Sequence, residues 1–374
     1  MAHTSMKDER FVFHNRRPSR RLTIGDVPVG GGAPISIQSM TNTRTADHEA
    51  TLSQILMLAV KGCQIIRVAI LDQTDIQALS IITGASALPV IADIHFDHRL
   101  AVGALEAGVA GLRINPGNIG ALWKVKEVVT AAKERKAPIR IGVNGGSLEA
   151  VLLDRYGGPT ASALVESALR HVEILDNLDF HDVKISLKSS RVPVMLEAYR
   201  DIAGKVDLPL HLGVTETGFP SQGLVKSAVG VGTLLAEGIG DTIRISFTGD
   251  PSEEVIAAKQ ILASLEMIPG GLQIIACPTC GRTQVDLAAM VKAAEQKFSA
   301  LDLPEGETLT IAIMGCPVNG PGEAREADFG IASGKGAGIL FAGGKQIKRL
   351  AEDELIDALY ELVLNSIVNE QAGR

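Results

Sequence analysis

The sequence predicts an α/β protein, with an eight-stranded parallel barrel followed by a small α+β domain. Short apolar strands alternate with helical stretches, and this alternation is typical of a parallel sheet. Eight strand–helix units fit into roughly 250 residues, which in number and length matches a TIM (β/α)8 barrel. The alternation changes at the Pro- and Gly-rich segment EMIPGGL (266–272), which predicts a domain boundary there.

The expected barrel strands are apolar segments that carry polar residues near their carboxyl ends. In chain order they lie at 35–40, 65–70, 89–96, 111–117, 138–145, 183–190, 210–216 and 242–250. Helical patterns separate them, for example at 46–63, 119–136 and 160–178. A doubly wound open sheet is the alternative, but it usually has fewer strands, and no G-x-G-x-x-G motif follows the first strand. The segment 20–36 predicts a β-hairpin at the bottom of the barrel.

The second domain is expected to mix strands and helices. The pattern predicts a strand at 272–276, a helix at 285–298 and a strand at 308–314. Gly-rich, hairpin-like strands follow at 329–344, and an amphipathic helix covers 352–371. We therefore expect a substrate-binding barrel over 1–268 and a smaller domain over 269–374.

Composition excludes several classes of protein. The 374 residues are 46% hydrophobic and 21% charged, as in ordinary globular proteins, and the net charge of −7 argues against a nucleic-acid or anionic-membrane partner. The first residues contain no apolar segment typical of a secretory signal, and no run approaches the ~18 apolar residues of a membrane span. Four cysteines form no secreted disulfide framework, so a cytoplasmic location is expected.

Polar side chains gather at the carboxyl ends of the expected strands, where the catalytic loops of a TIM barrel open. Any one of the cations among them could be part of a structural ion pair. Five cations at the ends of five strands instead predict a pocket for a polyanion, and clustered arginines favour phosphate. The candidate binding residues are Arg67, Asp93, Arg113, Asn115, Arg140, Asn144, Lys184, Ser186, Arg244 and Ser246, and Glu216 is the candidate acid.

Three of the four cysteines, Cys277, Cys280 and Cys316, follow apolar strands of the second domain. A structural zinc site needs four Cys or His ligands, but the last histidine of the chain is His211. A redox disulfide would not need Cys316. Three thiolates are compatible with an iron–sulfur cluster that has one open iron, or with one completed by an oxygen ligand such as Glu323. Cys63 is expected to be a buried small hydrophobe.

Eight motifs together carry a family resemblance that runs over essentially the whole chain. They are SIQSMTNT, ADIHF, LRINPGNIG, VNGGSL, ISLKSS, GVTETG, CPTCGR and GCPVNGPGE. With these motifs the sequence resembles the 4-hydroxy-3-methylbut-2-enyl diphosphate synthases of the methylerythritol phosphate route to isoprenoids.

The resemblance implies a TIM barrel joined to a [4Fe–4S] domain similar to those of sulfite and nitrite reductases. The implied ligands of the cluster are Cys277, Cys280, Cys316 and Glu323. The implied reaction is the reductive opening and dehydration of 2-C-methyl-D-erythritol 2,4-cyclodiphosphate, with two single electrons from flavodoxin or ferredoxin. A homodimer is also implied, in which the barrel of one subunit faces the cluster of the other.

The residues fit this implied reaction. A cyclic diphosphate needs a cationic cradle, and single electrons need a cofactor. Glu216 would protonate the departing hydroxyl, and Glu323 would leave its iron more readily than a thiolate. A pteroate-type barrel synthase would leave the cysteines unexplained, and a non-catalytic iron–sulfur carrier would leave the charged barrel unexplained. A radical enzyme using S-adenosylmethionine is disfavoured because the barrel has no C-x3-C-x2-C motif.

Overall fold

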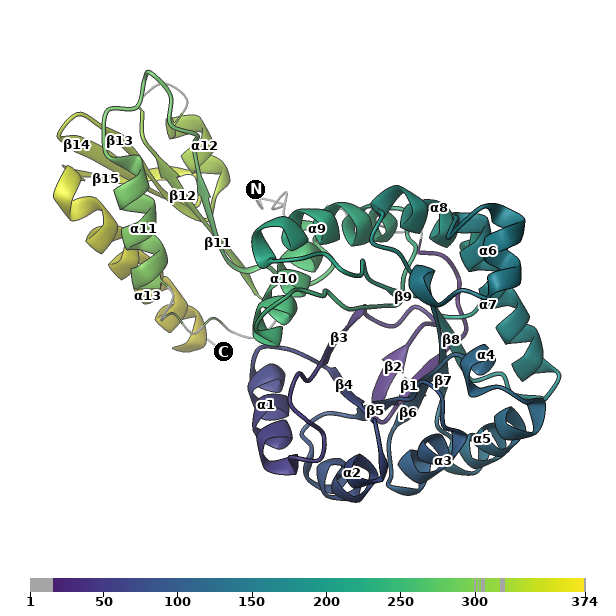
Figure 1. Ribbon diagram of the computed structural model, residues 1–374. Helices are drawn as coiled ribbons and strands as arrows, with labels where there is room; N and C mark the ends of the chain where they lie inside the picture. Colours follow the sequence, from purple (N-terminus) through teal and green to yellow (C-terminus); the bar gives the residue numbers. More distant parts are fainter. Residues whose placement is uncertain (1–15, 299–300, 302, 304–306, 317–319, 373–374) are drawn as a thin grey trace, which may run out of the picture. The chain divides into compact units, whose positions relative to one another are not determined.

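The chain divides into two compact units, Met1–Met267 and Ile268–Arg374. The computed structural model describes residues 16–298, 301, 303, 307–316 and 320–372 (Figure 1). Among these residues, no helix combines the length and the apolar character that crossing a membrane requires.

The first unit is a parallel barrel, which confirms the predicted TIM barrel (Figure 1). Its eight strands pair in the order β8-β7-β6-β5-β4-β3-β10-β9, and a parallel bridge between Ile185 and Leu210 joins the two ends. The strands are β3 (Ser36–Met40), β4 (Ile65–Ala69), β5 (Val90–Asp93), β6 (Gly111–Ile114), β7 (Ile139–Asn144), β8 (Val183–Lys188), β9 (His211–Leu212) and β10 (Thr242–Ile243).

Every strand lies inside its predicted segment, but most of them end earlier than predicted. The sheet ladder stops where the chain turns toward the next helix, so Asn115, Glu216, Arg244 and Ser246 belong to the following loops, whereas the other predicted site residues of the barrel lie within the strands.

Helices surround the strands on the outside of the ring (Figure 1). Asp47, Asp72, Asp97 and Asp250 each accept a hydrogen bond from the backbone of a first helical turn, so these acids fix where the helices begin. The helices are α1 (His48–Val60), α2 (Gln73–Ala85), α3 (His98–Glu106), α4 (Pro116–Ile119), α5 (Leu122–Arg135), α6 (Ala150–Tyr156), α7 (Ala161–Asp176), α8 (Val192–Ala203), α9 (Pro220–Ala236) and α10 (Pro251–Ser264), with a 3-10 turn at Gly145–Ser147.

An antiparallel hairpin of β1 (Leu22–Ile24) and β2 (Val27–Val29) precedes the barrel, as predicted. Ile24 and Val29 pack against Ile65 and Ile91, near the amino-terminal ends of β4 and β5. The turn needs Gly25, since its φ is +60° and a Cβ there would lie 2.7 Å from Cβ of Pro89. The hairpin therefore covers the bottom of the barrel.

The second unit contains one five-stranded sheet, in the order β11-β12-β13-β14-β15. β11 to β13 are parallel, whereas β13 to β15 are antiparallel. The strands are β11 (Gly271–Ala276), β12 (Thr308–Met314), β13 (Phe329–Gly334), β14 (Ala337–Ala342) and β15 (Lys345–Ala351). The helices are α11 (Leu287–Phe298), α12 (Gly320–Glu326) and α13 (Leu355–Ala372), with a 3-10 turn at Glu352–Glu354.

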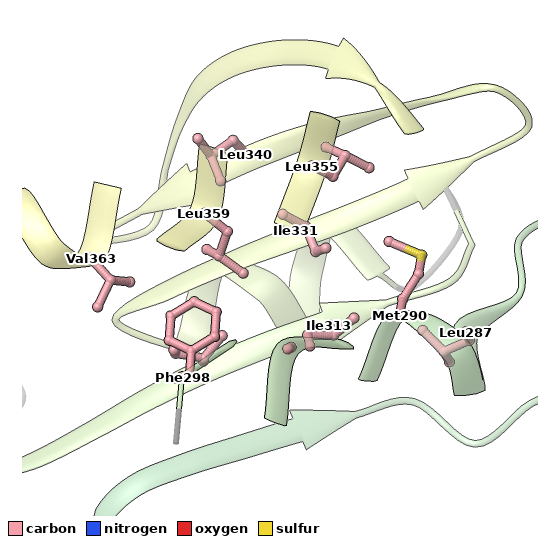
Figure 2. Packing of buried hydrophobic residues seen from close by; sticks show 11 residues of the cluster. Leu287, Met290, Phe298, Ile313, Ile331, Leu340, Leu355, Leu359 and Val363 are labelled. Atoms are coloured by element: carbon pink, nitrogen blue, oxygen red, sulfur yellow. The ribbon is translucent and has the colours of Figure 1, made fainter. Parts of the chain in front are cut away.

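A continuous apolar core holds this unit together, as Figure 2 shows. Leu287, Met290 and Phe298 of α11 meet Leu355 and Leu359 of α13, and Ile313, Ile331 and Leu340 of the sheet complete the cluster. One segment differs from expectation. The loop expected after Cys316 includes the helix α12 over GPGEARE, and residues 317–319 lie outside the described residues.

Candidate functional site

Buried cations line the inside of the barrel on three neighbouring strands. Arg113 of β6 is the register partner of Arg140 of β7, which in turn is the partner of Lys184 of β8. Register partners on adjacent strands project to the same face of a sheet, so the three side chains share the interior. All three are almost completely buried. Such an array of like charges requires an opposite charge nearby.

Asp93, at the end of β5, provides one such charge. Its carboxylate lies 3.1 Å from Nη1 of Arg113 and 3.5 Å from Nε of Arg67. Burial alone would raise the pKa of the Asp93 carboxyl, but the Arg67 and Arg113 guanidiniums outweigh burial and hold that pKa well below its usual range. Asp93 is therefore ionised and fixes two cations of the pocket.

Arg113 is held on both sides. Its Nη2 donates to the carbonyl oxygen of Gly142 at 3.1 Å, and its Nη1 lies 3.0 Å from Nε2 of His95. With its amide oxygen turned toward Arg113, Asn144 accepts from Nη2 at 3.1 Å. Gly142 leaves the space for the guanidinium, because a Cβ there would lie 2.4 Å from Nε of Arg113.

Arg140 and Lys184 are more completely buried than Arg113 and have fewer partners. Nη1 of Arg140 donates to Oε1 of Gln38 at 3.3 Å. Nε of Arg140 and Nζ of Lys184 are buried without a hydrogen-bond partner among the described residues. Burial lowers the pKa of both side chains, and the neighbouring cations lower it further. A bound anion would relieve both penalties.

The loops after β9 and β10 bring further candidates to the same end of the barrel. Arg244 is largely buried, and its Nη2 lies 3.6 Å from Oε2 of Glu254. Glu216 is exposed and adopts a left-handed φ of +55°. The hydroxyl of the next residue, Thr217, donates to the carbonyl oxygen of Ser246. The acid candidate is therefore fastened to the loop that carries Ser246.

Two predicted binding residues have their side chains occupied locally. The Asn115 side chain accepts from the amide of Gly117 at 3.1 Å and caps α4. The Ser186 hydroxyl donates to the carbonyl oxygen of Ile141 at 3.4 Å. Both residues are buried, so each has a structural role whether or not it also touches a ligand.

The barrel contains polar residues that sequence reasoning missed. Lys188 is buried on the same strand face as Lys184 and Ser186, and burial together with Arg244 lowers its pKa. The signal was present, since residues 184, 186 and 188 alternate along β8. His211 is fully buried with both ring nitrogens unpartnered among the described residues. Glu254 comes from a helix, where strand-end patterns give no indication.

Among the described residues, six cationic side chains line the inside of the barrel: Arg67, Arg113, Arg140, Lys184, Lys188 and Arg244. Two buried carboxylates, Asp93 and Glu254, lie among them. Even with some of the cations neutral, the wall carries an excess of positive charge. We call these eight residues the cationic pocket. It has the donors and the charge to bind a ligand with several anionic oxygens.

The second unit brings its thiols to one edge of the sheet. Cys277 follows β11 and Cys316 comes just after β12, and these strands are parallel neighbours with Ala276 opposite Ile313. The Gly315 amide lies 3.4 Å from Sγ of Cys277 and donates to it. Cys277 is half-buried, Cys280 is exposed, and Cys316 is 8% exposed.

A short turn shapes the loop between the first two thiols and α11. The amide of Cys280 donates to Oγ1 of Thr283, and the amide of Thr283 donates back to the Cys280 carbonyl, both at 3.0 Å. Gln284 then donates its amide to the carbonyl of Gly315, beside Cys316. The two cysteine loops are thus joined by the backbone hydrogen bond from Gln284 to Gly315 and by the bond from the Gly315 amide to Sγ of Cys277.

Glu323 is exposed in the first turn of α12. Within the described part of the chain, no three Cys, His, Asp or Glu side chains are placed closely enough to hold a metal ion. The donor set itself suits an iron–sulfur group, because Cys277 and Cys316 follow neighbouring parallel strands, Cys280 lies three residues after Cys277, and Sγ of Cys277 already accepts an amide hydrogen bond. Cys63, in contrast, is buried in the barrel, and burial raises its pKa to about 11, as expected for a structural thiol.

Comparison with known proteins covers both units. The GcpE TIM-barrel domain matches residues 19–259, and the GcpE protein C-terminal domain matches residues 273–365. The 4-hydroxy-3-methylbut-2-en-1-yl diphosphate synthase (flavodoxin) of Clostridium perfringens is 53% identical over 349 residues, which is 93% of this chain and 99% of that protein. The protein of the same name from Geobacter sulfurreducens is 54% identical over 91% of this chain and 96% of its own length. The one from Thermodesulfovibrio yellowstonii is 54% identical over 92% of this chain and 98% of its own length.

Proposed function

The chain belongs to the GcpE family, and we propose that it is a 4-hydroxy-3-methylbut-2-en-1-yl diphosphate synthase. In this reaction 2-C-methyl-D-erythritol 2,4-cyclodiphosphate is reductively opened and dehydrated to (E)-4-hydroxy-3-methylbut-2-enyl diphosphate. As part of the same proposal, residues 1–268 bind the substrate and residues 269–374 bind the cofactor.

The observation that carries the proposal is the cationic pocket. A cyclic diphosphate presents several anionic oxygens within a few ångströms, and Arg67, Arg113 and Arg244 offer guanidinium groups at the open end of the barrel. All three already contact a carboxylate of another strand or helix, Asp93 or Glu254, before any ligand arrives. Such preorganisation lowers the cost of orienting the ligand.

We propose that Glu216 supplies the proton that converts the departing hydroxyl into water. The support is its position at the mouth, on a loop that Thr217 fastens to Ser246. A left-handed φ in a non-glycine residue costs free energy and is often retained at a functional site. Asn144 is proposed to orient the ligand together with Arg113, whose side chain it contacts.

Cys277, Cys280, Cys316 and Glu323 would hold a [4Fe–4S] cluster, one per chain, which when bound supplies single-electron transfer. The Gly315 amide, already directed at Sγ of Cys277, would stabilise the thiolate form. We further propose a flavodoxin as electron donor, because the relatives are named for it, with a ferredoxin as the alternative. A homodimer and a cytoplasmic location are part of the same proposal.

Anaerobic assay of the cluster-loaded protein tests this function. The cyclic diphosphate, reduced flavodoxin and the protein should give the linear allylic diphosphate, detected by mass spectrometry, whereas the Glu216→Gln variant should bind substrate but turn over at least tenfold more slowly. A Glu237→Gln variant is a matched control, since Glu237 lies at the carboxyl end of α9 and pairs with Arg200 on the outside of the barrel. A protein with a full complement of iron and sulfide that leaves the cyclic diphosphate unchanged would overturn the proposal.

A further inference from the structure

Glu254 is the second carboxylate of the cationic pocket, and it comes from the first turn of helix α10. Its side chain is 7% exposed. Burial raises the pKa of the Glu254 carboxyl, although Arg244, Lys188 and Arg67 oppose this rise. A buried acid among cations is costly unless its oxygens have specific partners.

The two oxygens of Glu254 contact three different parts of the barrel. Oε1 accepts from the amide of Phe247 at 2.9 Å. Oε2 lies 3.6 Å from Nη2 of Arg244 and 3.5 Å from the hydroxyl of Ser39. One carboxylate therefore joins strand β3, the side chain of Arg244 and the loop that leads from β10 into α10.

The contact with Phe247 extends the effect of Glu254 toward the acid candidate. Phe247 directly follows Ser246, whose carbonyl oxygen accepts the hydroxyl of Thr217. Thr217 directly follows Glu216. Glu254 thus holds one end of a chain of contacts that reaches the loop carrying Glu216.

The contact with Arg244 is looser and leaves that side chain able to bind. Nε of Arg244 is buried without a hydrogen-bond partner among the described residues, and its nearest carboxylate is at ion-pair rather than hydrogen-bond distance. An anionic oxygen of a ligand could therefore add to the Glu254 contact without having to replace it.

We infer that Glu254 is a positioning residue of the barrel site. It holds Arg244 by charge and the Ser246–Phe247 loop by a hydrogen bond, so that both are in place for the diphosphate of the substrate. The inference rests on the proposed function, because it assigns Arg244 to the binding of a diphosphate.

The test uses the binding of inorganic diphosphate, measured by calorimetry on the full-length protein. In Glu254→Gln the amide oxygen can still accept from Phe247, but the charge is lost and an amide NH2 faces the Arg244 guanidinium. Affinity for diphosphate should fall about tenfold. Glu253→Gln, an exposed neighbour in the same helical turn, makes the same charge change and should bind as the wild type does.

A double-mutant cycle distinguishes positioning from general destabilisation. If Glu254 acts through Arg244, then Glu254→Gln should have no further effect on diphosphate affinity in an Arg244→Gln background. Additive losses, or unchanged affinity in Glu254→Gln, would overturn the inference. If Glu254→Gln does not fold, Glu254→Asp is used in its place, because it keeps the charge but is too short for all three contacts. An unchanged affinity of Glu254→Asp for diphosphate would refute the positioning role of Glu254.

Measurements on the wild-type protein distinguish a failure of the proposed function from a failure of the role of Glu254. Wild-type binding of diphosphate together with turnover of the cyclic substrate supports the proposed function, whatever the variants do. Wild-type binding with no difference between Glu254→Gln and Glu253→Gln would remove only the role of Glu254. Absence of both binding and turnover in the wild type would remove both.

Discussion

Arg140 and Lys184 are register partners on adjacent parallel strands, and each residue is 1% exposed. Two buried cations in this relationship repel each other, and Lys184 has no hydrogen-bond partner among the described residues. The barrel therefore retains an arrangement that opposes folding, which is expected where a site is built to bind a ligand of the opposite charge.

Replacing Lys184 by methionine should stabilise the barrel in the absence of ligand. The change removes an unpaired buried cation and keeps a similar volume, so the free energy of unfolding should rise by about 1 to 3 kcal/mol. Trp123, the single tryptophan of the sequence, lies in α5 and reports urea unfolding of the barrel by fluorescence. A lower unfolding free energy would mean that Lys184 has a compensating partner.

Arg113→Ala should weaken the binding of diphosphate by about 1.5 to 3 kcal/mol, the scale of a charge-assisted hydrogen bond. Arg135→Ala, on the exposed end of α5, changes charge by the same amount far from the pocket and serves as control. Equal affinities of the two variants, measured by calorimetry, would place the ligand elsewhere.

Asp93 should make barrel stability depend on pH on the acid side. Its folded-state pKa lies below the ordinary carboxyl value, so its contribution is fully present above about pH 5 and is lost as pH falls toward the folded-state pKa. The loss should be about 2 to 3 kcal/mol. Urea unfolding followed by Trp123 fluorescence should show a shallower acid-side decline for Asp93→Asn than for the wild type.

The exposed Asp182 provides the matched control for that experiment, because Asp182→Asn removes a carboxylate outside the pocket. Its profile should follow the wild type. An unchanged decline in Asp93→Asn would show that other carboxyl groups dominate acid unfolding of the barrel.

Cys316→Ser should lose iron and sulfide while the barrel stays folded, because the two units have separate cores. Cys63→Ala should keep the full content of both, since Cys63 lies inside the barrel. The prediction is checked by measuring iron and sulfide per chain and the anaerobic visible spectrum of both variants. A complete cluster in Cys316→Ser would exclude Cys316 as a ligand.

Glu323 should differ from Glu326, although both are exposed on α12. Glu323→Ala should keep a cluster on three thiolates but lose one iron readily, and Glu323→Cys should hold four irons firmly with little turnover, because a thiolate exchanges more slowly than a carboxylate. Glu326→Ala should resemble the wild type in anaerobic iron content and turnover. If both Glu323 variants behave as the wild type does, then Glu323 is not the ligand of the fourth iron.

The barrel could be predicted because each strand is a short apolar run between turn residues, and strand count and length then leave few architectures. The binding face of β8 was predicted only in part. Lys184 and Ser186 were chosen and Lys188 was not, although alternation places all three on one face. Most predicted strands extend too far, because the sheet ladder stops where the chain turns toward the next helix, and a residue pattern does not mark that point.

Other features depend on three-dimensional contacts that a pattern does not contain. Glu254 comes from a helix, and nothing local distinguishes it from its exposed neighbour Glu253. Asn115 stays a predicted ligand residue, and its side chain also caps helix α4, a contact that the strand-end pattern does not indicate. Helix α12 was expected to be loop, because its two glycines and proline suppress the helical pattern.

The hairpin of β1 and β2 has a kinetic consequence. Because Ile24 and Val29 pack across the bottom of the barrel, a ligand of the cationic pocket would enter and leave at the opposite end, where the carboxyl ends of the strands lie. We therefore expect product to leave and substrate to enter at the same end of the barrel, so that a slowly released product would inhibit competitively against the substrate.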